Sequence, residues 1–278
     1  MSGLAQQLRS LAQVTGGVGL VRLGQASVAL AGGGCLVLID PFLSPHPDRL
    51  VPPPLDPVEL DCVNVVLVTH EHWDHLDGPT CAAIARVALQ ATFLCPEPVV
   101  DQLVAAGVPA ERVSGTRPGQ SYRRADVTIW PIAAKHGLHA TDAYSFGEVD
   151  GVPRFLGYVV ELAGVRLYHA GDTIPYEGLA ESVGVLQPDV ALLPINGRDW
   201  YRERLDIVGN LDAREAAQLA AAIGAELLVP LHYDMFAANL ADPGELVRLV
   251  RERELALGVL VLPVGHPAVI CPARRRGR

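Results

Sequence analysis

Apolar residues recur along this chain in short continuous runs that are separated by Gly, Pro and polar residues. Three such runs, at residues 18–23, 26–31 and 35–39, follow an amphipathic segment at 2–12 that predicts a helix. The glycines at positions 32–34 separate the second and third runs and predict a hairpin turn. Continuous apolar runs of this length are typical of strands. The chain is therefore predicted to begin with a helix and three strands.

From residue 63 onward, predicted strands alternate with predicted helices, a pattern that indicates α/β packing. Strands are expected at 63–68, 91–94, 126–134, 155–162, 165–168, 189–195, 226–231 and 258–264, and helices at 78–89, 98–106, 213–223 and 243–252. No domain boundary and no short repeat is visible. We therefore predict a single domain over residues 1–278, with a helical extension at 1–15 and a disordered basic tail at 272–278.

Composition restricts the classes of function. Half of the 278 residues are hydrophobic, which is enough for a sizeable core, and the formal net charge of −9 argues against a non-specific nucleic-acid binder. The five cysteines are odd in number and form no Cys-x-x-Cys pair, as expected in a reducing compartment. The N-terminus lacks the pattern of an export signal, and no apolar run is long enough to span a membrane. We expect a cytoplasmic protein without nucleic-acid or membrane partners, and leave assembly into a homo-oligomer open.

One polar segment follows the apolar run at 63–68 directly and reads Thr-His-Glu-His-Trp-Asp-His. It places four side chains that can bind metals within six residues: His70, His72, Asp74 and His75. Because side chains alternate along a strand, His70 and His72 can point to one side, and the following turn lets the other two face an adjacent point. Imidazole and carboxylate ligands suit zinc, manganese or iron. The segment therefore predicts a site for two adjacent metal ions.

Other histidines stand at the ends of later apolar runs, where a site built on strand ends would recruit them. His136 follows the run at 126–134 and is the preferred candidate for the next ligand. The alternative is His139, three residues further along the chain. His232 follows the run at 226–231, and His266 follows the last run. Small residues at positions 170 and 171 would let the backbone approach the metals.

The segment from His70 to His75 resembles the signature of the metallo-β-lactamase superfamily, and the segments 168–172 and 230–234 resemble its remaining ligand motifs. Within the superfamily, the stretch 189–242 is similar to the L-ascorbate-6-phosphate lactonase-like group. The resemblance implies an α/β fold, the αββα four-layer sandwich. In this fold two mixed β-sheets face each other, helices cover the outer faces, and the metals lie at one edge.

The resemblance also implies a role for each ligand. The first metal site would consist of His70, His72 and His136, and the second of Asp74, His75 and His232. Asp172 would bridge the two metals, because a carboxylate can offer one oxygen to each. Asp40 would support the site from the end of the third strand, with a turn cap as the alternative, and His169 would steer Asp172.

These ligands predict a metal-dependent hydrolase with one or two divalent ions per chain, zinc or manganese, with iron as an alternative. A metal lowers the pKa of bound water from roughly 16 to about 7, so that hydroxide exists at neutral pH. Asp74 would orient this nucleophile or take its proton. The lactonase resemblance implies a small, anionic substrate such as a sugar-acid lactone. The alternatives are a metal-dependent phosphodiesterase and a non-catalytic metal-binding protein of the same fold.

Three further segments are expected to surround the site. The loop that follows the run at 189–195 contains four side chains that could hold an anionic or sugar-like substrate: Asn196, Arg198, Trp200 and Arg202. The alternative for this loop is a solvated segment with ion pairs to Glu203 and Asp206. The Pro-rich segment 43–57 is expected to border the mouth of the site, and the insertion 141–154 to form a flap over it.

Overall fold

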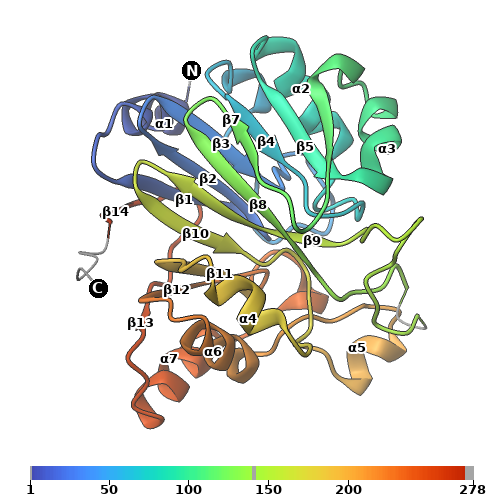
Figure 1. Cartoon of the computed structure of the whole chain (residues 1–278), viewed down its shortest axis with the longest axis vertical. Coiled ribbons are helices and arrows are strands. Elements are labelled where there is room, and N and C mark those ends of the chain that lie inside the picture. The colour runs from blue at the N-terminus through green and yellow to red at the C-terminus, as the bar shows by residue number, and fades with distance from the viewer. Residues whose placement is uncertain (1, 140–141, 273–278) are drawn as a thin grey trace.

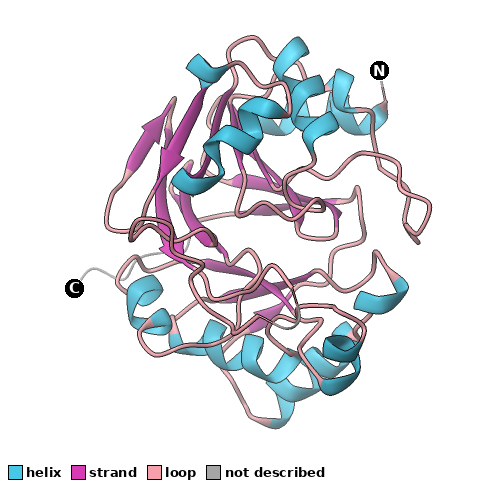
Figure 2. Cartoon of the chain, turned by 90° about the vertical axis from the view of Figure 1, so that its right-hand side faces the viewer, coloured by secondary structure: helices cyan, strands magenta, loops and turns pink. Residues whose placement is uncertain are grey.

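The computed structural model describes residues 2–139 and 142–272 as two seven-stranded sheets packed face to face. Helices cover the outer face of each sheet, which gives the four layers visible in Figures 1 and 2. The predicted αββα four-layer sandwich with two mixed sheets is therefore confirmed.

The first sheet has the strand order β14-β1-β2-β3-β4-β5-β6. Pairing is antiparallel from β14 to β3 and parallel from β3 to β6. The strands are β1 (Val18–Gly24), β2 (Ser27–Gly32), β3 (Cys35–Ile39), β4 (Val65–Leu67), β5 (Thr92–Pro96), β6 (Val113–Thr116) and β14 (Pro267–Ile270). The helices on its outer side are α1 (Gly3–Ala12), α2 (Gly78–Val87) and α3 (Val100–Ala105).

The second sheet repeats this plan with the order β13-β12-β11-β10-β9-β8-β7. Pairing is antiparallel from β7 to β10 and parallel from β10 to β13. The strands are β7 (Tyr122–Arg124), β8 (Val127–Ala133), β9 (Leu156–Leu162), β10 (Val165–His169), β11 (Val190–Pro194), β12 (Leu227–Leu231) and β13 (Gly258–Val259). The helices that follow its strands are α4 (Leu179–Gly184), α5 (Trp200–Arg204), α6 (Ala213–Ala222) and α7 (Pro243–Glu252).

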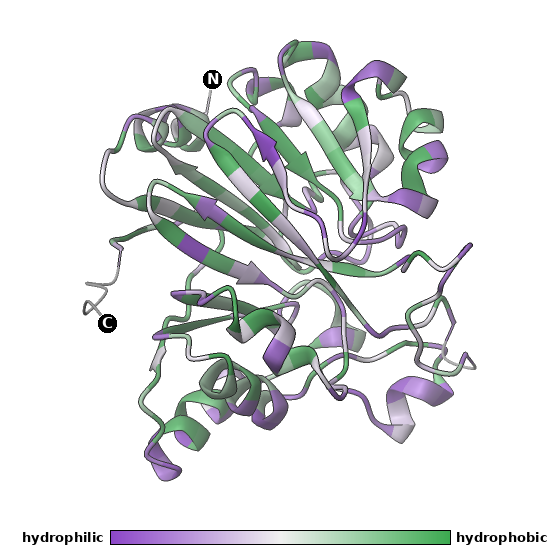
Figure 3. Ribbon diagram, in the orientation of Figure 1, coloured by the Kyte–Doolittle hydropathy of each residue, from purple (hydrophilic) through white to green (hydrophobic). Residues whose placement is uncertain are grey.

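Three apolar layers hold the sandwich together. One lies between the sheets, and the others lie between each sheet and its helices. Every residue of β1, β2, β3, β4 and β11 is buried, which explains why their sequences are continuous apolar runs rather than alternating ones. The mostly apolar colouring of these strands is visible in Figure 3.

The predicted elements differ from the structure at the sheet edges and in two short helices that were not predicted, α4 and α5. The strand predicted at 258–264 is wrong beyond Val259. The chain instead turns at Gly265, with φ of 77°, and β14 crosses to the first sheet. The edge strands β6 and β7 were not predicted, because most of their residues are partly exposed and form no apolar run.

The predicted N-terminal extension forms α1, which packs on the first sheet through Leu8 and Ala12. The predicted basic tail lies outside the described residues from position 273 onward. All five cysteines are free thiols. Among the described residues, every helix is too short or too polar to cross a bilayer.

A fully buried arginine connects β1 to the C-terminal half of the chain. The Arg22 guanidinium donates to the Tyr233 hydroxyl and the Leu262 carbonyl at 2.8 Å, and forms a 2.8 Å ion pair with Asp234. It also lies 4.5 Å from the centre of the Tyr233 ring. Removing one partner of such a pair leaves the other groups unsatisfied, so Arg22 fixes the segment that follows β12.

We predict that Arg22→Leu lowers the free energy of unfolding by roughly 3 kcal/mol, measured by urea denaturation. Arg214→Leu, at an exposed position of α6, is the matched control and should change it by less than about 0.5 kcal/mol. Equal, small effects of both substitutions would contradict this role of Arg22.

Candidate metal centre

The predicted ligands meet at one edge of the sandwich, where strands of both sheets end. The segment from His70 to His75 follows β4, and His136 follows β8. Asp172 follows β10, and His232 follows β12. In the second sheet β10 and β12 are both parallel to β11, so their carboxyl ends lie at one edge of that sheet. In the first sheet β3 and β4 are parallel, so Asp40 and the segment from His70 to His75 follow neighbouring strand ends.

Seven side chains form two adjacent groups that could each hold a cation. In each group, one possible ligand atom per residue lies within 4.8 Å of the others. The first group is His70, His72, His136 and Asp172, and the second is Asp74, His75 and His232. All are buried except His72, which is partly exposed. His139, the alternative to His136, is exposed and lies outside both groups.

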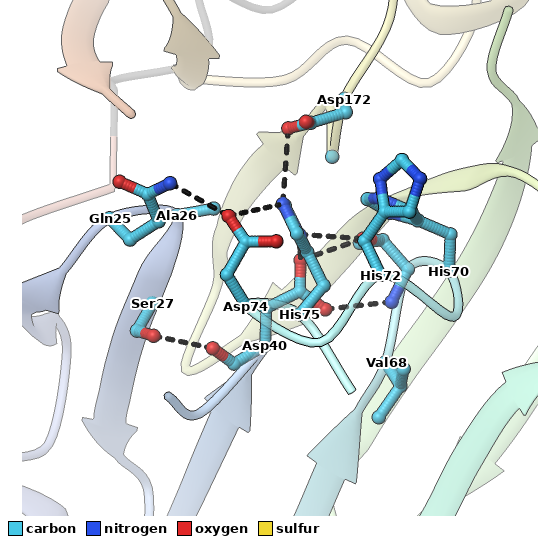
Figure 4. Close-up of polar contacts among 12 residues, drawn as sticks. Gln25, Ala26, Ser27, Asp40, Val68, His70, His72, Asp74, His75 and Asp172 are labelled. Atoms are coloured by element: carbon cyan, nitrogen blue, oxygen red, sulfur yellow. Dashed lines mark hydrogen bonds and ion pairs between the residues drawn. The ribbon is translucent and has the colours of Figure 1, made fainter. Parts of the chain in front are cut away.

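Asp172 lies between the two groups. Its Oδ1 is 3.3 Å from His75 Nε2, and its Oδ2 is 3.6 Å from His136 Nε2 and 3.4 Å from His232 Nε2. One carboxylate thus reaches histidines of both groups, which is the position required of a bridging ligand. Figure 4 shows the contact with His75.

Asp40 supports the second group through His75. Its Oδ2 lies 2.7 Å from His75 Nδ1, and both residues are labelled in Figure 4. Oδ2 also accepts from the Thr69 hydroxyl, and Oδ1 accepts from the Thr69 amide. This contact places the proton of His75 on Nδ1 and leaves Nε2 to face Asp172. A carboxylate behind the imidazole is the usual arrangement around a metal-binding histidine.

His169 is buried and contacts backbone rather than the ligand atoms. Its Nδ1 accepts from the Gly171 amide at 3.1 Å, and its Nε2 donates to the Ala26 carbonyl at 2.8 Å. Gly171 has φ of 60°, and a Cβ there would lie 2.7 Å from the Leu156 carbonyl oxygen. Neighbouring backbone therefore leaves no room for a side chain at Gly171, and His169 holds the turn that delivers Asp172. The approach of this backbone to a metal stays a prediction.

Opposite charges shift the pKa values of four of the seven ligand residues. Burial disfavours charge on His75, but the carboxylates of Asp172 and Asp40 outweigh it and raise its pKa well above the usual value. Burial likewise disfavours charge on His232, but the carboxylates of Asp172 and Asp74 outweigh it and raise its pKa. Burial also opposes ionisation of Asp74 and Asp172, yet the neighbouring histidines hold both pKa values below the usual range. The site is thus arranged for positive charge between its carboxylates.

Several buried ligand atoms have no hydrogen-bond partner among the described residues. They include His75 Nε2, both ring nitrogens of His136 and Asp172 Oδ1. Each unpaired buried polar atom costs about 1–3 kcal/mol, so such a cluster calls for a group that satisfies several at once. Burial also lowers the pKa of His136 to about 3, which keeps its ring neutral and able to bind a metal. These residues fit one or two divalent cations.

The two groups form the floor of a cavity of about 730 Å³. Five of the seven ligand residues line it: His72, Asp74, His136, Asp172 and His232. As predicted, the Pro-rich segment borders the cavity, through residues 46–50. The described part of the predicted flap, residues 142–154, does not line it, and Arg154 ties that segment to Glu71 at 3.2 Å.

The four predicted substrate-binding residues lie away from this cavity. Arg198 forms an ion pair with Glu215 at 2.6 Å, and Arg202 forms one with Asp199 at 2.6 Å. Together with the buried Asn196, both arginines line a separate hollow of about 400 Å³, and Trp200 is 68% exposed. The alternative prediction of ion pairs in this loop is confirmed in kind, because both arginines form one. Their partners are Glu215 and Asp199 rather than the predicted Glu203 and Asp206.

Sequence reasoning missed several residues around the metal centre. Gln25 contacts Asp74, and Phe236 and Trp73 form part of the cavity wall. Trp73 lies inside the metal-binding motif, so its position beside the site could have been inferred from the sequence. Gln25 and Phe236 lie far from the motif in sequence, and nothing in their local pattern indicates a role.

The fold and this ligand arrangement define the class of protein. Residues 36–233 match the Beta-lactamase superfamily domain, and this range contains all seven predicted ligands. The chain belongs to this superfamily.

Its relatives narrow the family further. The chain is 31% identical over 262 residues to a UPF0173 metal-dependent hydrolase of Hyperthermus butylicus, covering 90% of this chain and 98% of that protein. For a protein of the same name from Methanoculleus marisnigri the identity is 32% over 257 residues, with coverage of 92% and 98%. The chain therefore belongs to the UPF0173 metal-dependent hydrolase family. Its particular closeness to the lactonase-like group stays a prediction.

Solved structures agree with the fold. The metallo hydrolase Igni18 of Ignicoccus hospitalis has a TM-score of 0.69 and 24% identity, covering 91% of this chain and 98% of that one. An isothiocyanate hydrolase from Delia radicum gut bacteria has a TM-score of 0.71 and 18% identity, with coverage of 91% and 99%.

We predict that saturating Mn²⁺ or Zn²⁺ raises the melting temperature of the metal-free protein. A cation at 100 times its Kd adds about 2.7 kcal/mol to stability, which corresponds to an increase of roughly 5 °C or more for a chain of this length. Differential scanning fluorimetry before and after EDTA treatment measures this shift. An unchanged melting temperature with both ions would contradict the assignment of a metal centre.

We predict that Asp40→Asn weakens metal binding by about 10-fold to 100-fold, because the amide no longer holds His75 as a carboxylate does. Calorimetric titration of the metal-free variant with Mn²⁺ tests this. Asp56→Asn, at the exposed N-cap of the short 3-10 helix Pro57–Glu59, is the matched control. Equal affinities of the two variants would show that Asp40 only caps a turn.

Proposed function

We propose that this protein is a metal-dependent hydrolase of a small, uncharged ester, with a lactone as the expected class. The observation that carries the proposal is the position of the two ligand groups on the floor of the cavity. Its volume of about 730 Å³ is in the range of small-molecule sites. A cytoplasmic location remains part of the proposal.

Apart from the ligand residues, the side chains around the cavity offer little positive charge for an anionic group of the substrate. Asp48 and Asp206 line the cavity. The one arginine among the described lining residues, Arg49, donates to three backbone carbonyls and stacks on Phe42 at 4.4 Å. Because Arg198 and Arg202 line the separate hollow, the structure lends no support to the expected anionic substrate. A neutral lactone therefore suits this lining better than a phosphorylated lactone or a phosphodiester.

An aromatic wall beside the ligands supports binding of a flat apolar group. The rings of His46 and Trp73 stack with centres 4.8 Å apart, and Phe236 meets Trp73 edge-on at 5.4 Å. Trp73 is 52% exposed and lies between His72 and Asp74 in the chain. Aromatic side chains of this kind bind planar groups through their faces and edges.

When bound, divalent cations supply a Lewis acid for the ester carbonyl and acidify water. The protein's own side chains orient the water and the substrate. Asp74 stays ionised because His75 and His232 lower its pKa despite burial, so it can only accept a hydrogen bond or proton. Its Oδ2 is fixed by Gln25 at 2.7 Å. Asp74 is therefore placed to orient water at the cavity floor by accepting a hydrogen bond from it.

The proposal is tested by hydrolysis assays on protein loaded with Mn²⁺ or Zn²⁺. The substrates are a phenyl-substituted lactone, a sugar-acid lactone with a phosphate group, and an activated phosphodiester. We predict turnover of the phenyl lactone, and a decrease of about 10²-fold to 10⁴-fold in kcat in Asp74→Asn. Preferred turnover of the phosphodiester would move the protein to the alternative activity. If none of the three substrates shows metal-dependent turnover, the result would contradict the proposal and favour the alternative of a non-catalytic metal-binding protein.

A second substitution tests the aromatic wall. We predict that Trp73→Ala raises KM for the phenyl lactone about 3-fold to 10-fold with little change in kcat, because the lost contact is made to a non-reacting part of the substrate. The same variant should hydrolyse an unsubstituted lactone like the wild type. An equal loss with both lactones would assign Trp73 to the metal centre instead of to substrate recognition. Trp200→Ala, on α5, serves as the control for loss of an exposed tryptophan.

A further inference from the structure

Gln25 is a buried polar residue at the metal centre that belongs to neither ligand group. It lies in the tight turn between β1 and β2, and its exposed fraction is 0%. Its φ of 53° is in the left-handed region, where glutamine is uncommon. A strained backbone of this kind persists only where the surrounding structure fixes it, and it is frequent at functional sites.

Gln25 contacts two of the three members of the second group. Its Nε2 donates to Asp74 Oδ2 at 2.7 Å and lies 3.1 Å from His232 Nε2 (Figure 4 shows the contact with Asp74). Its backbone carbonyl accepts from the His232 amide at 3.0 Å. One residue of the first sheet therefore holds both the side chain and the backbone of a ligand that follows a strand of the second sheet.

These contacts link ligands that come from different sheets. Asp74 follows β4 in the first sheet, and His232 follows β12 in the second. Their nearest ligand atoms, Asp74 Oδ2 and His232 Nε2, are 3.5 Å apart, and these are the same two atoms that the amide of Gln25 meets. The spacing of the second group thus depends on Gln25 as well as on the packing of the two sheets.

The amide of Gln25 is only half satisfied. Its Oε1 is buried and has no hydrogen-bond partner among the described residues. Most buried polar atoms are paired. An unpaired oxygen beside two ligand residues therefore indicates that a glutamine is present at position 25 for its function rather than for stability. An apolar side chain of similar length would avoid this cost, but it would give up the contact with Asp74.

We propose that Gln25 is a positioning residue that sets the affinity of the second metal site by fixing Asp74 relative to His232. The first group depends on other contacts, since none of the hydrogen bonds of Gln25 reaches His70, His72 or His136. Loss of the amide therefore weakens one of two cation sites and spares the other. The inference rests on the metal dependence in the proposed function, but it is independent of the substrate.

The test is a calorimetric titration of metal-free protein with Mn²⁺, together with the metal content after dialysis. Gln25→Met keeps the length of the side chain and removes its hydrogen bonds. We expect two binding events in the wild type, and in the variant an unchanged first event with a second weakened by about 10-fold to 100-fold. Gln218→Met, on the exposed side of α6, is the matched control and should bind both ions like the wild type.

A third variant distinguishes a specific contact from general loosening. Gln25→His can still donate a hydrogen bond, and histidine tolerates the left-handed backbone better than most residues. We expect it to recover part of the second binding event. Unchanged binding of both ions in Gln25→Met, or equal weakening of both, would overturn the inference. A wild-type protein that binds one ion would overturn it as well, whereas a wild type that binds none would also overturn the metal dependence in the proposed function.

Discussion

The buried hydrogen bond between Asp40 and His75 is the interaction on which the candidate metal centre depends. Both side chains are fully buried, and Asp40 Oδ2 and His75 Nδ1 are 2.7 Å apart. The same carboxylate binds the amide and hydroxyl of Thr69, so it fixes both ends of the motif that follows β4. Because Asp40 closes β3, the ligand loop is anchored to the strand beside it. Asp172 can then approach from the other sheet and face histidines of both ligand groups.

Continuous apolar runs predicted most of the strands, and the resemblance to the metallo-β-lactamase superfamily implied the four layers and the edge where the ligands gather. Such runs occur because a sheet covered on both faces needs apolar side chains on both. The ligands could be found because three histidines and an aspartate occur within six residues after a buried strand, and His136, Asp172 and His232 follow other strands. The preference for His136 over the exposed His139 rested on its position at a strand end, and the structure places His136 in the first group.

What the sequence could not predict depends on contacts between distant segments. Gln25 has no local signature, since its role follows from the meeting of a hairpin turn with Asp74 and His232. Arg198 and Arg202 were natural candidates for an anionic substrate, but ion pairs with Glu215 and Asp199 hold them in another hollow. The short edge strands were missed for a related reason: their stability comes from pairing with a neighbour rather than from an apolar pattern.

The most direct test of this account is anomalous X-ray diffraction from crystals of the protein soaked in Mn²⁺. If the seven side chains form two cation sites joined by Asp172, the map will show two anomalous peaks at the cavity floor, about 3.5–4 Å apart. One peak will lie among His70, His72 and His136, and the other among Asp74, His75 and His232. Peaks elsewhere, or none at this edge of the sandwich, would contradict the central claim.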